Sequence, residues 1–171
     1  MIKRYLASFI LLAAAALPAR AAAPELIGKF DDWAVYKTSG ADGTVCYALA
    51  QPKATQPANV RRDPIFFLIS TWPTKSVQGE PSIVAGYPYR EGSRASVEIG
   101  SDKFEFYTQN EGTDGGAWMK EPTEEQRLLD AMRRGASMVV KGTSRRGTLT
   151  IDNYSLKGIS AALDKLAAGC Q

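Results

Sequence analysis

The chain has 171 residues, with 21 Lys and Arg against 18 Asp and Glu, a formal net charge of +3, two cysteines and no histidine. Without histidine, the Ser–His–Asp and Cys–His nucleophile systems lack their base, and two cysteines alone cannot complete a tetrahedral zinc site. Carboxylate chemistry remains as a catalytic alternative, and neither a metal nor another cofactor is expected.

Residues 1–21 have the pattern of a secretory signal peptide. A basic start with Lys3 and Arg4 precedes an apolar run over residues 5–17, and small residues follow up to Ala21. The run is shorter than the roughly 20 apolar residues that a membrane-spanning helix needs. We therefore expect export with cleavage after Ala21, and an uncleaved N-terminal anchor is the alternative. The mature chain is expected to contain no transmembrane segment.

The mature chain, residues 22–171, is predicted to be neutral. The leader contains three basic residues and no acid, which leaves 18 basic and 18 acidic residues. A nucleic-acid partner therefore has no support from overall charge. Arginine pairs remain at 61–62, 133–134 and 145–146. The length suits one ordinary hydrophobic core, so a single domain over 22–171 is expected.

Short apolar or alternating segments between turns predict a mainly β protein. The expected strands cover residues 30–36, 45–51, 63–72, 82–86, 95–99, 104–108, 137–143 and 148–154. Within the third strand, residues 65–69 form the longest apolar run outside the leader, which indicates burial on both faces. The remaining segments are expected to be a lead-in (22–28), a loop (52–62), a glycine-rich loop (110–116) and turns (38–44, 75–81, 87–93, 100–103, 144–147). Short strands joined by turns favour a sandwich or a small barrel.

Two helices are expected late in the chain. Thr123 as N-cap and Gln126 as the third helical residue form a capping box, and Gly135 follows the first helix. The glutamates of its first turn and the arginines of its last turn complement the helix dipole, which explains these charges without catalysis. The second helix covers residues 158–170. Its apolar stripe consists of Ile159, Leu163, Leu166 and Cys170.

Cys46 and Cys170 are the only cysteines. An even pair in an exported protein suggests a disulfide, here between the end of the chain and an early strand. A buried or redox-active free thiol is the alternative. The absence of a CxxC spacing favours the disulfide, and the buried stripe of the last helix places Cys170 on the face that packs against the sheet.

Seven segments combine into a pattern that covers nearly the whole mature chain. They are FDDWAVY (30–36), CYALAQPK (46–53), RRDPIFFLISTWP (61–73), GEPSIVAGYPY (79–89), VEIGSDKFEFYTQ (97–109), MVVKGTSRRGTLT (138–150) and YSLKGISAALDKLAAGC (154–170). In this combination the chain resembles the invasion-associated locus B proteins of alphaproteobacteria. In many members, a cysteine shortly after the W-x-V of the first strand forms a disulfide with the cysteine before the A-x-x-Q segment. This chain has Tyr36 and Lys37 at the position of that first cysteine. The resemblance therefore leaves the pairing of Cys46 with Cys170.

The resemblance implies an exported envelope protein with an immunoglobulin-like β-sandwich and two late helices, one at the C-terminus. Its place would be the periplasm or the outer membrane, or it would be secreted, and in some pathogens such proteins are linked to host-cell invasion. No catalytic residues come with the family. The expected function is therefore a non-catalytic binding or structural module whose partner is an envelope or host-surface protein.

Five residues in two turns are candidate partner contacts, because Tyr and Arg are enriched at interface hot spots. They are Tyr87, Tyr89 and Arg90 in YPYR, and Arg145 and Arg146 in SRRG. The alternatives are packing of the tyrosines beside Pro88 and a solvated hairpin tip for the arginines. The alternative function is a carboxylate-dependent hydrolase of envelope glycan or peptidoglycan, which needs two carboxylates across a cleft.

Overall fold

The computed structural model describes residues 23–41 and 43–170, so the predicted signal peptide lies outside the described residues. The strands are β1 (Glu25–Phe30), β2 (Trp33–Gly40), β3 (Gly43–Ala50), β4 (Ala54–Gln56), β5 (Phe66–Trp72), β6 (Val77–Val84), β7 (Arg94–Ile99), β8 (Asp102–Glu111), β9 (Asp114–Trp118), β10 (Ser137–Thr143) and β11 (Leu149–Ser155). The helices are α1 (Pro122–Arg134), α2 (Ile159–Gly169) and the short 3-10 helix η1 (Pro73–Lys75). None of the described helices is long and apolar enough to cross a membrane.

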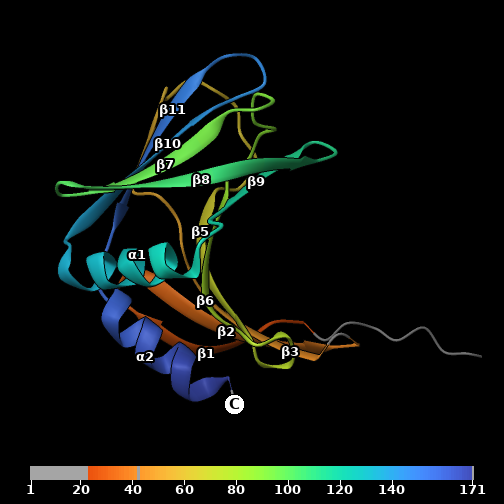
Figure 1. The fold of residues 1–171 in the computed structure, drawn as a ribbon, viewed down its shortest axis with the longest axis vertical. Coiled ribbons are helices and arrows are strands. Elements are labelled where there is room, and N and C mark those ends of the chain that lie inside the picture. The colour runs from red at the N-terminus through yellow and green to blue at the C-terminus, as the bar shows by residue number, and fades with distance from the viewer. Residues whose placement is uncertain (1–22, 42, 171) are drawn as a thin grey trace, which may run out of the picture.

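The strands form one antiparallel sheet in the order β1-β2-β3-β5-β6-β9-β8-β7-β10-β11-β4. The sheet bends so strongly that β1–β3 lie opposite β7, β8, β10 and β11, with β5, β6 and β9 between them (Figure 1). α2 packs on β1, β2 and β3, and α1 packs on β6 and β8. The predicted mainly β fold with two late helices, one at the C-terminus, is confirmed. The structure adds that hydrogen bonds join the two facing layers into a continuous sheet.

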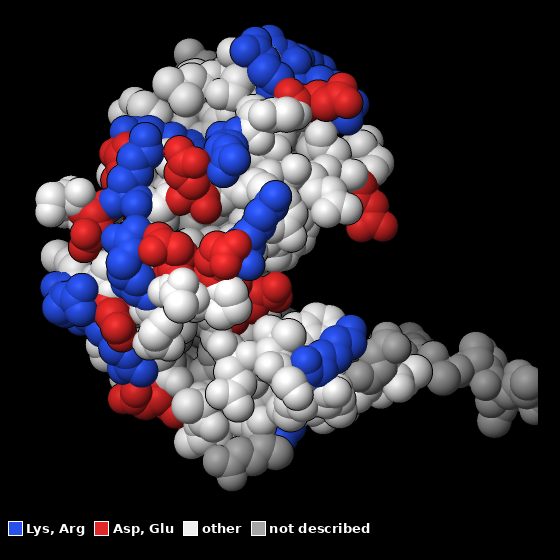
Figure 2. Space-filling view, in the orientation of Figure 1, with Lys and Arg blue, Asp and Glu red and all other residues white. Residues whose placement is uncertain are grey.

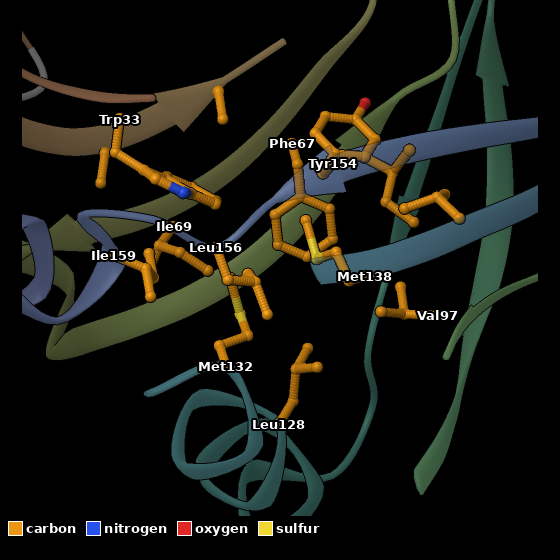
Figure 3. Packing of buried hydrophobic residues seen from close by; sticks show 14 of the residues in the cluster. Trp33, Phe67, Ile69, Val97, Leu128, Met132, Met138, Tyr154, Leu156 and Ile159 are labelled. Carbon is orange, nitrogen blue, oxygen red and sulfur yellow. The ribbon is translucent and has the colours of Figure 1, made fainter. Parts of the chain in front are cut away.

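The predicted apolar run supplies the centre of the core. The ring of Phe67 on β5 contacts Trp33 from β2, Phe106 from β8 and Tyr154 from β11, with centroids 6.1–6.3 Å apart. These edge-on contacts join both layers, and side chains from α1 and α2 close the core from one side (Figure 3). Residues of the run on the opposite face of β5 are half-buried rather than buried, so one face carries most of the core.

Three strands form where the sequence predicts none. β1 occupies the predicted lead-in and pairs with β2 alone, at the edge of the sheet. β4 is a three-residue edge strand inside the predicted loop and pairs with β11. β9 occupies the predicted glycine-rich loop, between β6 and β8.

The glycines of β9 serve close packing rather than a turn. A Cβ atom on Gly115 would lie 2.2 Å from the carbonyl oxygen of Tyr87, and one on Gly116 would lie 2.2 Å from the ring of Trp118. A strand can therefore run through this position because side chains are missing there. A separate difference concerns β6, which begins at Val77, inside the segment 75–81 that the sequence predicts to be a turn.

The start of α1 differs from the predicted capping box. The helix begins at Pro122 with Glu121 as N-cap, and no side chain caps it. Proline suits this first helical position because its missing N–H would be unpaired anyway. Gly135 ends the helix as predicted but with an extended φ of −83°. In α2 the predicted stripe is buried as expected.

Candidate functional site

The predicted disulfide is present between Cys46 on β3 and Cys170 after α2. Their Cα atoms are 5.7 Å apart, within the usual range for a disulfide. Both residues are buried, and Lys37 donates from its Nζ to the carbonyl oxygen of Gly169 nearby. The disulfide therefore fixes the last helix to the sheet, at the end of the molecule opposite the turn of the β10–β11 hairpin.

A cleft of about 730 Å³ lies at that opposite end, where the β10–β11 hairpin turns. Its walls come from the segment before β5, the segment after β6, the β8–β9 turn and the β10–β11 hairpin. The lining residues are Asn59, Val60, Arg61, Arg62, Asp63, Gly86, Tyr87, Pro88, Thr113, Ser144, Arg145, Arg146, Thr148 and Thr150. Figure 2 shows a group of Lys and Arg side chains at this end of the molecule, with acidic side chains directly beside it. We call it the arginine cleft.

Backbone hydrogen bonds hold the two predicted motifs together at the cleft. The N–H of Arg145 donates to the carbonyl oxygen of Pro88 at 2.8 Å, and the N–H of Arg90 donates to that of Thr143 at 2.9 Å. Tyr89 also forms an isolated β-bridge with Ser144. YPYR and SRRG, distant in sequence, therefore form one surface.

Arg62 forms the floor of the arginine cleft and is held there by a buried ion pair with Asp152, which does not itself line the cleft. Arg62 donates from Nη1 and Nη2 to the two carboxylate oxygens of Asp152, at 2.6 and 2.8 Å. Its Nε and Nη2 also donate to the carbonyl oxygen of Ala85, at 3.1 and 2.8 Å. The side chains are 6% and 4% exposed. Arg62 is thus neutralised from within the fold, and its role is to shape the floor.

Tyr87 connects this ion pair to the wall of the cleft. The Arg62 guanidinium lies 4.9 Å from the centroid of its ring, and its hydroxyl is 2.6 Å from that of Thr150. Burial raises the pKa of Tyr87, while the hydrogen bond with Thr150 and the charge of Arg62 lower it to a smaller extent. The phenol therefore stays neutral at physiological pH and acts as a hydrogen-bonding wall.

Three arginines on the rim of the cleft have no ion-pair partner among the described residues. Arg61, Arg145 and Arg146 are exposed, and none forms an ion pair with another described residue. Asp63 is the one carboxylate among the lining residues. The rim therefore presents an excess of positive charge to solvent.

Tyr89 and Arg90, the other two predicted partner contacts, do not line the arginine cleft. Tyr89 is 1% exposed and packs its ring edge-on against Tyr87, and the side-chain amide of Asn110 bonds to both its N–H and its carbonyl oxygen. Burial favours the packing explanation for Tyr89. Arg90 is exposed but does not line the cleft, and its Nη2 lies 2.9 Å from the place that a Cβ atom on Gly147 would occupy.

Asp152 is the residue of this site that sequence reasoning missed. It lies on the inward face of β11 between Thr150 and Tyr154, both of which are buried. A carboxylate at an inward position of a strand is costly unless it is paired. The alternation of inward positions 150, 152 and 154 along the strand was the sequence signal that Asp152 has a buried cationic partner.

The clefts do not bring two carboxylates together. Asp63 alone lines the arginine cleft, and a second cleft of about 520 Å³, beside the helices and the disulfide, has no carboxylate among its lining residues. Burial, and then the charge of Glu80, raise the pKa of Glu125, but neither residue lines either cleft. No group of three or more potential metal ligands occurs among the described residues.

Removal of two tyrosine hydroxyls is expected to have different effects. Tyr87→Phe should lower the free energy of unfolding by about 0.5–1.5 kcal/mol, because the Thr150 hydroxyl loses its 2.6 Å hydrogen bond and keeps only the 3.4 Å bond to the carbonyl oxygen of Gly142. Tyr154→Phe should be neutral or stabilising, since its buried hydroxyl has no hydrogen-bond partner among the described residues. Urea unfolding of both variants checks this, and a larger loss for Tyr154→Phe would show that a partner exists for that hydroxyl.

The fold and the site together define a mainly β protein, closed by one disulfide, with a cationic cleft at the end of its sheet. The chain belongs to the family described as invasion associated locus B (IalB) protein, which it matches over residues 33–167. The resemblance seen in the sequence is thereby confirmed.

A solved structure supports the same fold. The crystal structure of invasion associated protein b from Bartonella henselae matches with a TM-score of 0.55 and 14% sequence identity. The match covers 86% of this chain and 97% of that chain. A search of curated proteins finds no match.

Proposed function

We propose that this protein is an exported, non-catalytic envelope protein that binds a partner protein through the arginine cleft. The observation that carries the proposal is the convergence of separate arginine and tyrosine motifs on one cleft. Arg and Tyr are the residues most enriched at interface hot spots. The absence of histidine from the chain and the single carboxylate in the cleft favour binding over hydrolysis.

We also propose that the protein is exported by means of its leader and acts outside the cytoplasm. The leader is cleaved after Ala21, and residues 22–171 form one domain that resides in the periplasm or at the outer membrane, or is secreted. The partner is an envelope protein or a host-surface protein, and in pathogens this binding supports host-cell invasion. Protease shaving of intact cells separates the two kinds of partner, because a surface-displayed protein is cleaved and a periplasmic one is protected.

Replacing Arg145 and Arg146 together by alanine is expected to reduce partner binding with little effect on folding. Both side chains are exposed and form no ion pair with a described residue, so the free energy of unfolding should change by less than about 0.5 kcal/mol. In-cell crosslinking with mass spectrometry should then show loss of the adducts formed by the unmodified protein.

The control is the other adjacent exposed pair, Arg133→Ala with Arg134→Ala, at the end of α1, which also removes the exposed ion pair between Arg133 and Asp164. These substitutions remove the same charge far from the cleft and should leave the adducts in place. An unchanged adduct pattern in the Arg145 and Arg146 variant would eliminate the arginine cleft as the binding surface.

A further inference from the structure

We infer that the arginine cleft takes an acidic segment of a partner protein, with carboxylates that pair with the rim arginines and apolar side chains that rest beside them. This inference rests on the proposed function, since it names the chemistry of the ligand for the same site. Three features of the cleft carry the inference: the charge of its rim, its apolar lining residues and the hydrogen bonds that fix its walls.

The positive charge of the rim favours an anionic ligand. Of the other described arginines, Arg62, Arg94, Arg127 and Arg133 have carboxylate partners within the fold, and Arg90 and Arg134 do not. The three rim arginines at 61, 145 and 146 also have none among the described residues, and Asp63 is the only acid among the residues that line the cleft. A guanidinium binds a carboxylate through two parallel N–H···O bonds, which makes arginine a specific receptor for this group.

Apolar side chains at the same end favour a protein segment over a free inorganic anion. Three large hydrophobic side chains are exposed among the described residues, and two of them, Val60 and Leu149, are here, 38% and 55% exposed. Val60 lines the cleft together with Tyr87 and Pro88, whereas Leu149 is on the opposite face of β11 from the lining residue Thr150 and is not itself a lining residue. Interfaces combine such apolar contacts with arginine. The site is also concave, which suits an inserted segment better than a flat lipid surface.

The walls are fixed before a ligand arrives. Arg145 is held to Pro88 by a backbone hydrogen bond, and the floor is held by the four donor contacts of Arg62. A pre-organised site loses less conformational entropy on binding than a mobile loop does. The cleft volume is also within the usual range for a binding pocket.

Selection from a random peptide library displayed on phage, with the mature protein immobilised, tests the ligand class. We expect the selected peptides to be enriched in Asp and Glu together with apolar residues. Their affinity should fall about tenfold in the Arg145→Ala plus Arg146→Ala variant and also fall with added salt, because exposed charges are screened. Replacing each Glu or Asp of a selected peptide by Gln or Asn should cause a similar loss.

Selected peptides without acidic residues, equal affinity for the arginine variant, or no selection at all would each overturn the inference. Vesicles of phosphatidylglycerol and inorganic phosphate serve as competitors, and binding to either one in place of peptide would assign the cleft to a lipid headgroup or a free anion. If in-cell adducts still depend on Arg145 and Arg146 while acidic peptides fail, the binding role stands and the acidic ligand is rejected.

Discussion

Replacing Arg62 by alanine is expected to lower the free energy of unfolding by about 3–5 kcal/mol, because removal of one partner leaves a buried charge without compensation. The carboxylate of Asp152, whose side chain is 4% exposed, would lose both of its arginine donors. The carbonyl oxygen of Ala85 would lose the donors from Nε and Nη2 as well. Urea or thermal unfolding of the purified mature protein measures the change.

The matched control is Arg94→Ala. Its ion pair with Glu105 is 3.3 Å long but exposed, at 65% and 56%, so its loss should cost less than about 1 kcal/mol. Equal effects of Arg62→Ala and Arg94→Ala would contradict a buried pair. The double variant Arg62→Met with Asp152→Leu should recover part of the loss, since no charge is then left buried.

The different environments of Arg61 and Arg62 show which features of this site can be predicted from the sequence and which cannot. The two residues are adjacent and identical in type, yet Arg61 is exposed on the rim and Arg62 is neutralised in the floor. The difference depends on Asp152, which is distant in sequence. The sequence predicts Tyr87, Tyr89, Arg90, Arg145 and Arg146 alike as partner contacts. The burial of Tyr89 and the division between floor and rim depend on packing between distant segments, such as that of β11 against the segment before β5.

The secondary structure shows the same limit, since elements with local sequence signals are predicted and elements specified by distant residues are missed. The β10–β11 hairpin and α2 are predicted well, because alternation, turn residues and a continuous apolar stripe are local signals. β9 is missed, because Gly115 and Gly116 have the local pattern of a turn and their strand is specified by Tyr87 and Trp118. β1 and β4 are missed because each is an edge strand whose only partner, β2 or β11, decides its conformation.

Reduction of the disulfide, or replacement of Cys46 and Cys170 together by serine, is expected to lower the free energy of unfolding by about 2–5 kcal/mol. The two residues are separated by 124 positions, so the bond removes many conformations from the unfolded chain. Unfolding should be followed with and without a reductant. The reductant should destabilise the unmodified protein and have no effect on the double variant, which serves as the matched control.

Loss of the disulfide should also have a local signature. Ile159, Ala162, Leu163 and Leu166 bury one face of α2 independently of the sulfur atoms. Hydrogen exchange should therefore increase in the last turn of α2, near Gly169, while the first turn near Ile159 remains protected. Uniform exchange along the whole helix would instead mean that the disulfide, and not the buried stripe, holds α2 on the sheet. In that case the late helix would depend on an oxidising compartment, which would strengthen the proposed export of the protein.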